Sequence, residues 1–332
     1  MVILELVERL GAVAEGAVVT VTVTSSAAMD DVRSWCARSG NTLLAVDQAG
    51  NGGPTVVKVR RGRAADPMSE LPAERRPGAR LWIYTNFDCN LACDYCCVRS
   101  SPQADRRALG ADQVRRLVRE GAAAGVSEVF LTGGEPFLLP DLGDLVAASA
   151  AVLPTTLLTN GMLFRGRRLE TLRGFPRQVR LQISLDSATP DLHDRHRGAG
   201  TWARSVAGIR TALAEGFPVR VAATLSTVDV VEERELRAFL DDLGIPARDQ
   251  ALRPLARQGF ADEGLELAAA TLVPEITVTR DGVYWHPVAA DDEQLRISTE
   301  LFPLEETIAR VQDRFRAYRN ATTDAAAAFP CA

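Results

Sequence analysis

The strongest constraint on the fold is a regular alternation of short apolar runs and amphipathic helical segments that begins at Leu81. The apolar runs have the length of strands, and helical periodicity follows each of them. This alternation predicts βαβ units around a parallel sheet, and therefore an α/β fold. Five or six units predict an open or partial (β/α)6 barrel, because a full eight-fold barrel needs about 250 residues. The expected strands span 81–86, 128–132, 155–159, 179–185 and 219–225, and the expected helices span roughly 108–124, 141–152, 165–173, 202–215 and 231–243.

Shorter regions flank this barrel segment. A small α+β unit is expected before it, with Ser25 or Ser26 capping its second helix and Gly40 following that helix. Its elements are a helix over 3–10, a strand over 17–24, a helix over 29–38 and strands over 41–46 and 54–59.

The residues between the α+β unit and the barrel segment are rich in proline and charge, which is typical of a linker. After Gly259 the pattern predicts a hairpin that turns at 280–282 and a helix over 303–319. The predicted regions are an α+β domain (1–62), a linker (63–79), a partial barrel (80–260) and a C-terminal extension (261–332).

Composition narrows the class of protein. The 332 residues are 46% hydrophobic and 24% charged, as in ordinary globular proteins. A formal net charge of −5 gives no general attraction to nucleic acid or to an anionic membrane. The first ten residues lack the pattern of a signal peptide, and no apolar stretch is long enough to span a bilayer. We therefore expect a cytoplasmic protein with reduced cysteines.

Four of the six cysteines lie within nine residues, directly after the first barrel strand. In a reducing compartment such a cluster indicates metal binding. It lies at the carboxyl end of the strand, where α/β barrels build active sites. Three thiolates, Cys89, Cys93 and Cys96, can each hold one iron of a [4Fe–4S] cubane. The fourth iron then keeps an open position for a small molecule, as catalytic metal sites do.

Two other kinds of metal site fit the cysteine pattern less well. Structural zinc needs four ligands, usually as two separated pairs, and the second pair is missing. A cluster that only carries electrons would use Cys97 as its fourth ligand. Adjacent side chains diverge, so we expect Cys97 to be a packed thiol near the ligands instead.

The spacing Cys89-x3-Cys93-x2-Cys96, with an aromatic residue at Tyr95, resembles the signature of the radical S-adenosylmethionine (SAM) superfamily. The resemblance covers about residues 80–260. It implies a [4Fe–4S] cluster on the three cysteines, with SAM chelating the open iron through its amino and carboxylate groups. In that family the cluster cleaves SAM reductively, and the resulting 5′-deoxyadenosyl radical abstracts hydrogen from a substrate. The cofactors carry this chemistry and the protein orients them.

Later motifs of the family recur in order. The segment 133–136 resembles the family's GGE(P) motif, which holds the SAM amino group, and 193–198 resembles its HD-x-x-RG segment. Asn160, at the end of the third strand, is either a SAM contact or part of a capping turn. Thr224 and Leu225 are placed by the resemblance near the adenine. The cofactor-binding residues that the resemblance implies are Tyr95, Gly133, Gly134, Glu135, Asn160, Ser184 and Arg197.

The C-terminal region departs from many relatives. The hairpin over 276–287 resembles the start of the SPASM or twitch extension, which binds auxiliary clusters through several cysteines. His286 stands where the first of these cysteines is expected, and only Cys331 follows. A four-cysteine auxiliary cluster therefore lacks ligands. We predict a single cluster, and we expect His286 to be packed or to face substrate rather than to be a ligand of a second centre. Cys331 is expected to be a tail thiol, with a role as hydrogen donor or substrate handle as the alternative.

The N-terminal region resembles the TusA-like sulfur-carrier fold, truncated at its start. The active cysteine of that family belongs to a Cys-Pro pair between the first strand and the first helix, and the sequence contains no such pair. Cys36 lies on the second helix and does not correspond to it. The resemblance then favours docking or substrate recognition over sulfur transfer.

The sequence thus predicts an oxidoreductase or lyase-type radical SAM enzyme, with no catalytic side chain assigned. An acidic flavodoxin or ferredoxin is the expected reductant. The expected substrate is a ribosomally made peptide or a precursor of a cofactor or natural product. The alternative from another class is a non-enzymatic iron–sulfur or zinc binding module that acts in a complex.

Overall fold

The structure is a computed structural model that divides into two compact units, residues 1–72 with 313–332, and residues 73–312. Each unit is described by itself. No helix among the described residues is long and apolar enough to cross a membrane. The described residues are 2–48, 55–62, 66–225 and 230–328.

The smaller unit contains a three-stranded antiparallel sheet with two helices, as expected, and also residues 313–328 of the long C-terminal helix. Alternate residues of its first strand are buried, namely Val19, Val21 and Val23, so one face of the sheet is apolar. The second helix begins at Ser25, whose hydroxyl accepts the Ala28 N–H at 3.2 Å. The elements are α1 (Val2–Gly11), β1 (Val18–Val23), α2 (Ser26–Ser39), β2 (Thr42–Gln48) and β3 (Thr55–Arg60), with the sheet order β1-β3-β2.

The larger unit contains one sheet of nine strands in the order β12-β11-β10-β4-β5-β6-β7-β8-β9. The six strands from β4 to β9 are parallel, as the βαβ pattern predicts. Leu81, Ile83 and Leu131 are fully buried, as in sheets that are covered on both faces. The parallel strands are β4 (Arg80–Tyr84), β5 (Glu128–Thr132), β6 (Thr155–Thr159), β7 (Arg180–Ser184), β8 (Val219–Leu225) and β9 (Gln250–Pro254).

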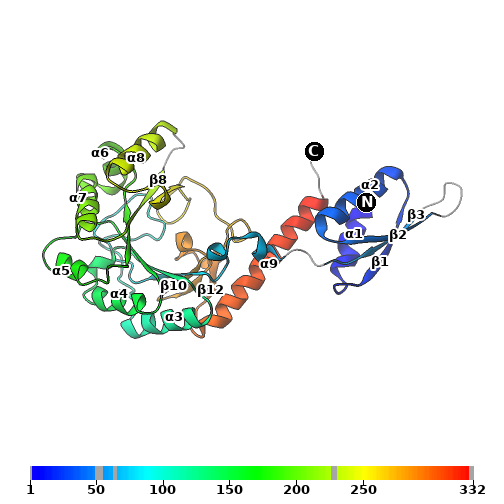
Figure 1. Ribbon diagram of the computed structural model, residues 1–332, viewed down its shortest axis with the longest axis horizontal. Coiled ribbons are helices and arrows are strands. Elements are labelled where there is room, and N and C mark those ends of the chain that lie inside the picture. Colours follow the sequence, from blue (N-terminus) through cyan, green and yellow to red (C-terminus); the bar gives the residue numbers. More distant parts are fainter. Residues whose placement is uncertain (1, 49–54, 63–65, 226–229, 329–332) are drawn as a thin grey trace. The chain divides into compact units, whose positions relative to one another are not determined.

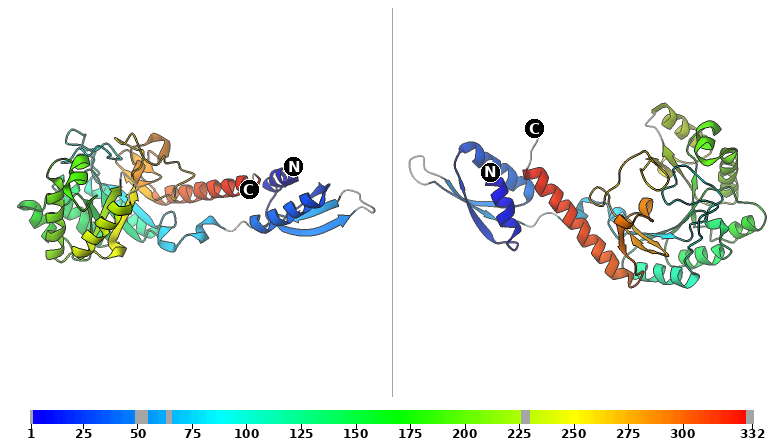
Figure 2. Two further views of the ribbon diagram at one scale, coloured as in Figure 1. Left: turned by 90° about the horizontal axis from the view of Figure 1, so that it is seen from above. Right: turned by 180° about the vertical axis from the view of Figure 1, so that it is seen from behind.

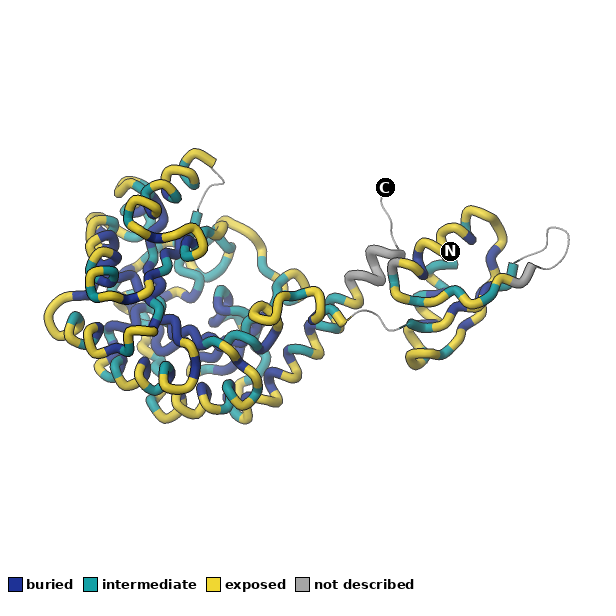
Figure 3. The backbone as a smooth tube through the Cα atoms, in the orientation of Figure 1, coloured by how far each residue is buried: buried dark blue, intermediate teal, exposed yellow. Residues whose placement is uncertain are grey.

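Helices cover the outer side of this curved sheet in both Figure 1 and the rear view of Figure 2. Their buried residues face the strands, and their outer faces are exposed (Figure 3). The sheet therefore forms an open barrel in which the six parallel strands β4 to β9 all end on one side. The helices are α3 (Ala111–Ala123), α4 (Leu142–Ala150), α5 (Arg167–Arg173), α6 (Pro190–Arg197), α7 (Thr201–Ala214), α8 (Val230–Asp242) and α9 (Leu304–Ala328), of which only 304–312 lie in this unit.

The predicted hairpin is part of the barrel sheet. Its first strand pairs parallel to β4, with Ile276 opposite Leu81. A short third strand, absent from the sequence prediction, pairs with the second. The hairpin thus extends the sheet on the side of β4 away from β5. The strands are β10 (Ile276–Thr279), β11 (Gly282–Tyr284) and β12 (Arg296–Ser298).

The segment that follows β9 runs from one edge of the parallel sheet to the loop that follows β4 in the sequence and carries the four clustered cysteines. The Phe260 N–H donates to the Cys96 carbonyl at 3.0 Å, and the Gln258 side chain donates to Asp292 at 3.0 Å. Gly259, with φ of 66°, lies so close to Cys96 that a Cβ would stand 2.1 Å from its carbonyl oxygen. The segment after β9 is therefore joined to this loop by hydrogen bonds and a close backbone contact, and not by strand pairing.

Four further elements differ from expectation besides β12. The helix α6 and the strand β9 occupy segments for which no element was predicted, and the predicted linker contains two turns of 3-10 helix. Those turns are η1 (Pro67–Glu70) and η2 (Ala73–Arg75).

Candidate SAM and iron–sulfur site

The predicted site residues meet at the carboxyl ends of the parallel strands. The cysteine loop follows β4, the Gly-Gly-Glu segment follows β5, Asn160 follows β6, and Ser184 ends β7. Parallel strands bring such termini to one edge, where open α/β sheets bind ligands.

The three predicted ligands lie on one ordered loop. Cys89 is buried, and Cys93 and Cys96 are half-buried. The Leu91 N–H points at the Cys89 sulfur at 3.4 Å, and the Ser100 N–H points at the Cys96 sulfur at 3.3 Å. Such donors stabilise thiolates, as N–H groups around iron–sulfur clusters do. The donor set therefore fits an iron–sulfur cluster.

The thiols are close enough for negative charge on one of them to shift the pKa of another. Burial raises the pKa of Cys93 to about 11. The nearby Arg197 guanidinium lowers this pKa, and negative charge on Cys96 raises it. Burial, the Glu135 carboxylate and the other two thiols also raise the pKa of Cys89. Three thiolates at this point need a compensating cation, which bound iron supplies.

Cys97 shares its neighbours with Cys96 but not with the other two proposed ligands. Cys96 and Cys97 pack against a cluster formed by Tyr84, Phe87, Val98 and Ala290, whereas Cys89 and Cys93 pack with Leu91 and Met162. Burial raises the pKa of Cys97 to about 12. This placement agrees with a packed thiol beside the third ligand.

The two glycines after β5 let that segment lie against the cysteine loop. A Cβ on Gly134 would stand 2.3 Å from the Asp88 carbonyl oxygen, and one on Gly133 would stand 2.4 Å from the Asn86 side chain. Two hydrogen bonds join the segments, from Gly134 N–H to the Asn86 carbonyl and from Glu135 N–H to the Asp88 carbonyl, both at 3.0 Å. The glycines thus allow the backbone after β5 to lie directly against the backbone of the cysteine loop.

The Glu135 side chain is fully buried and accepts three hydrogen bonds. The donors are Thr159 Oγ1 at 2.8 Å, the Asn160 N–H at 2.8 Å and the Phe137 N–H at 3.0 Å. Burial raises the pKa of Glu135 to about 6, although these bonds act in the opposite direction. A carboxylate offers about four acceptor positions, so about one remains for a ligand.

Asn160 connects β6 to the cysteine loop. Its Nδ2 donates to Asn90 Oδ1 at 2.8 Å, and its side-chain oxygen Oδ1 accepts the Met162 N–H at 3.0 Å. The second of these bonds belongs to a capping turn. Both expectations for Asn160 are therefore compatible with its position.

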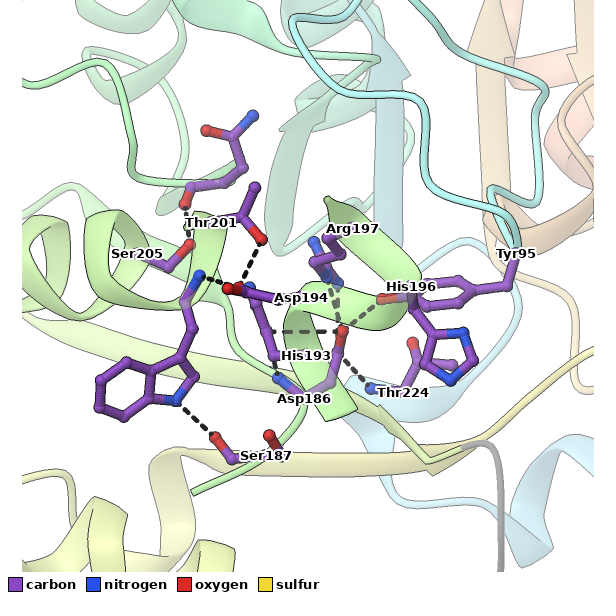
Figure 4. A network of polar contacts seen from close by, with 12 residues as sticks. Tyr95, Asp186, Ser187, His193, Asp194, His196, Arg197, Thr201, Ser205 and Thr224 are labelled. Atoms are coloured by element: carbon purple, nitrogen blue, oxygen red, sulfur yellow. Dashed lines mark hydrogen bonds and ion pairs between the residues drawn. The ribbon is translucent and has the colours of Figure 1, made fainter. Parts of the chain in front are cut away.

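Asp186, two residues after Ser184, is the centre of a buried polar network (Figure 4). Arg197 donates to both of its oxygens, from Nε at 2.6 Å and Nη2 at 3.1 Å. The Tyr95 hydroxyl and the Thr224 N–H also donate to this carboxylate, and the His193 ring accepts the Asp186 N–H. Burial alone would raise the pKa of Asp186, but Arg197 and these donors lower it overall.

This network joins two predicted SAM contacts, Tyr95 and Arg197, to a residue whose central role the sequence did not indicate. The Tyr95 hydroxyl and the Nε and Nη2 groups of Arg197 all donate to Asp186, so these three groups are engaged within the protein. Arg197 Nη1 makes no hydrogen bond to any side chain or backbone group in the described ranges. The available signal in the sequence was Arg197, which follows Asp186 by eleven residues.

The segment 193–198 forms most of α6 rather than a loop. Asp194 accepts hydrogen bonds from the Gly200 N–H at 2.6 Å and the Trp202 N–H at 2.7 Å, at the start of α7. His196 pairs with Asp94, 2.9 Å away, and His193 is fully buried. Ordering of the segment by its own hydrogen bonds, the favoured expectation for both histidines, matches this geometry.

The remaining candidates lie elsewhere. His286 is half-buried, and its Nδ1 accepts the Val288 N–H at 3.3 Å. Cys36 is 3% exposed in the core of the smaller unit, where burial raises its pKa to about 11. Cys331 lies outside the described residues.

Comparison with known families agrees with this geometry. Residues 83–243 match the model of the Radical SAM superfamily, across the cysteine loop and the network around Asp186. This segment is a radical SAM domain. Residues 1–61 match the model of Sulfurtransferase TusA, in agreement with the N-terminal resemblance.

Curated relatives match the radical SAM domain in part. The AdoMet-dependent heme synthase of Methanosarcina barkeri is 31% identical over 184 residues, which are 55% of this chain and 52% of that protein. The PqqA peptide cyclase of Ruegeria pomeroyi is 37% identical over 139 residues, which are 41% of this chain and 37% of that protein. The chain therefore spans about half or less of these relatives.

Among solved structures, native anSMEcpe with bound AdoMet superposes with a TM-score of 0.55 at 12% identity, covering 71% of this chain and 82% of that chain. At this identity the likeness concerns the fold. It agrees with the open parallel barrel of the radical SAM domain.

Proposed function

We propose that this chain is a radical SAM enzyme that holds one [4Fe–4S] cluster on Cys89, Cys93 and Cys96. The observation that carries the proposal is the placement of these thiols on one loop at the carboxyl ends of the strands, with N–H donors aimed at two of the sulfurs. When bound, the cluster supplies the electron that cleaves SAM, and the resulting radical removes hydrogen from a substrate. The chain's own residues orient the reactants and exclude water.

We assign the proposed SAM contacts to donor and acceptor positions that the hydrogen bonds of the described residues leave unused. Glu135 keeps about one acceptor position, suited to an ammonium N–H. Arg197 keeps Nη1, suited to a carboxylate. Asn160 and Ser184 flank them at the ends of β6 and β7. In this proposal Tyr95 acts by holding Asp186, and thereby Arg197, in position.

The backbone of Gly133 and Gly134 completes the proposed SAM site, since both glycines lie against the ligand loop. The proposed substrate is a peptide or a cofactor precursor. The names of the heme synthase and the peptide cyclase support these two classes. We also propose a flavodoxin or ferredoxin as reductant and, because the cluster needs reduced thiols, a cytoplasmic location.

The domain limits 1–62, 63–79, 80–260 and 261–332 are part of the proposal. The hairpin is then an extension that has joined the barrel sheet through β10. The smaller unit, in which Cys36 is the one cysteine among the described residues and is buried in the core, is proposed to serve in docking or recognition.

Anaerobic reconstitution tests the function. The protein should bind about four irons per chain, and with dithionite and SAM it should release 5′-deoxyadenosine. Cys93→Ala should lose both the iron and the product. Cys97→Ala is the matched control and should keep its iron, because Cys97 is not one of the three proposed ligands.

The same experiment decides the alternative. A protein that holds about four irons but releases no 5′-deoxyadenosine with any reductant would be an iron–sulfur module without this activity. Bound zinc in place of iron would exclude the proposal altogether.

A further inference from the structure

A hollow of about 520 Å³ lies beside the ligand loop, on the side of α6 and α7. Asn90, Leu91, Ala92 and Asp94 line one wall. The last residues of α6 and the first turn of α7 line the other wall. The ligand loop between Cys89 and Cys93 is therefore itself a wall of this surface.

The charge of the hollow is opposite to that of the whole protein. Arg195 and Arg204 both line it, are exposed, and form no ion pair with any residue that the structure describes. Of the other charged side chains, Arg197 is paired with Asp186, and Asp94 is the one acidic side chain that lines the hollow, 2.9 Å from His196. Two uncompensated cations thus stand together on a chain whose formal net charge is −5.

Helix stability does not explain the position of Arg204. It lies in the first turn of α7, where the partial positive charge of the helix terminus disfavours a cation. Asp194 already supplies the anion that this terminus needs, through hydrogen bonds from the Gly200 and Trp202 N–H groups. A cation kept at this point adds positive potential to the hollow beyond what the fold requires.

The hollow is also the place where the ligand loop meets solvent. Ala92 and Asp94 are exposed, and Cys93 between them is half-buried. Electron transfer by tunnelling falls steeply with distance, so an electron donor must approach where little protein separates it from the ligands. A protein seated in the hollow would contact the residues between two of the proposed ligands directly.

We propose that Arg195 and Arg204 form the docking site for an acidic one-electron carrier protein that reduces the cluster. This inference rests on the proposed function. One electron leaves the carrier, which is oxidised by one unit, and enters the cluster, which is reduced by one unit. No bond forms or breaks in this step. The arginines act by steering and holding the carrier, as charges at the rim of an interface do.

The test is charge reversal. A double variant, Arg195→Glu with Arg204→Glu, removes the basic pair, and Arg210→Glu is the matched control. Arg210 is an exposed arginine on the same helix that does not line the hollow. All three proteins are reconstituted and compared in two assays, with a recombinant flavodoxin as the probe. The first assay measures flavodoxin binding in the absence of SAM, and the second measures 5′-deoxyadenosine with either flavodoxin or dithionite.

The double variant should bind flavodoxin about tenfold more weakly or worse, with a smaller dependence on salt. Its flavodoxin-driven product formation should fall by a similar factor, while its dithionite-driven rate stays that of the wild type. Arg210→Glu should behave as the wild type in every assay.

Three results would overturn the docking site. They are unchanged flavodoxin binding in the double variant, an equal loss in Arg210→Glu, and a lowered dithionite-driven rate with a raised KM for SAM. The last result would assign the hollow to SAM itself. Absence of product from the wild type with dithionite would instead refute the proposed function, so the two failures are distinguishable.

Discussion

Replacing Gly134 by alanine tests how tightly the ligand loop is held. The added Cβ would lie 2.3 Å from the Asp88 carbonyl oxygen, whereas ordinary contact begins at 3.4 Å. The two backbones must therefore separate by about 1 Å. The hydrogen bonds from Gly134 and Glu135 to the loop, both at 3.0 Å, would lengthen beyond useful range.

The expected loss follows from these two effects. Overpacking costs about 1–3 kcal/mol, and each hydrogen bond contributes about 1 kcal/mol, so the unfolding free energy should fall by about 3–5 kcal/mol. The displaced loop should also bind less iron, because it carries the proposed ligands. Urea unfolding followed by circular dichroism measures the first quantity, and iron analysis after anaerobic reconstitution measures the second.

Gly143→Ala is the control for this substitution. Gly143 lies in α4, and the nearest atom to an added Cβ is Thr171 Cγ2 at 3.9 Å. Alanine there should stabilise the helix by up to about 1 kcal/mol. The reasoning about Gly134 would be refuted if its alanine variant kept full iron binding and an unfolding free energy within about 1 kcal/mol of the wild type.

Three further predictions concern buried or capping carboxylates. Asp186→Asn leaves the buried Arg197 without its charge partner, so urea unfolding should show a loss of about 3–5 kcal/mol. Asp194→Ala removes the acceptor for the first N–H groups of α7 and should cost about 1–2 kcal/mol in the same assay. Burial raises the pKa of Glu135 from 4.5 to about 6. Its native carboxyl thus keeps its proton to higher pH than the unfolded chain does. Relative to Glu135→Gln, the wild type should therefore lose about 2 kcal/mol of stability as pH rises through that window, and a flat difference would contradict this.

Much of the barrel could be predicted because its apolar runs end at clear turn residues. The strands over 128–132 and 155–159 match β5 and β6, each of which ends before a glycine or asparagine segment. The helix α6 was missed because it is polar on nearly every side, with only His193 buried. Its order comes from contacts with α7, which local pattern does not encode.

The residues of the proposed site could be predicted from the sequence, but the hydrogen bonds between them could not. The cysteine spacing alone indicates which thiols lie together. It does not indicate that Asp186 occupies one edge of the Arg197 guanidinium, since these residues lie on different elements. β9 was missed for a similar reason, because this half-exposed strand gains its place by pairing with β8.

The hydrogen bond from Phe260 to the Cys96 carbonyl has a thermodynamic consequence. It ties the segment that follows β9 to a proposed iron ligand, so binding of the proposed cluster and ordering of this segment would share one free energy. Under the proposed function, the Phe260 amide should therefore exchange with solvent more slowly when the cluster is bound than when it is absent.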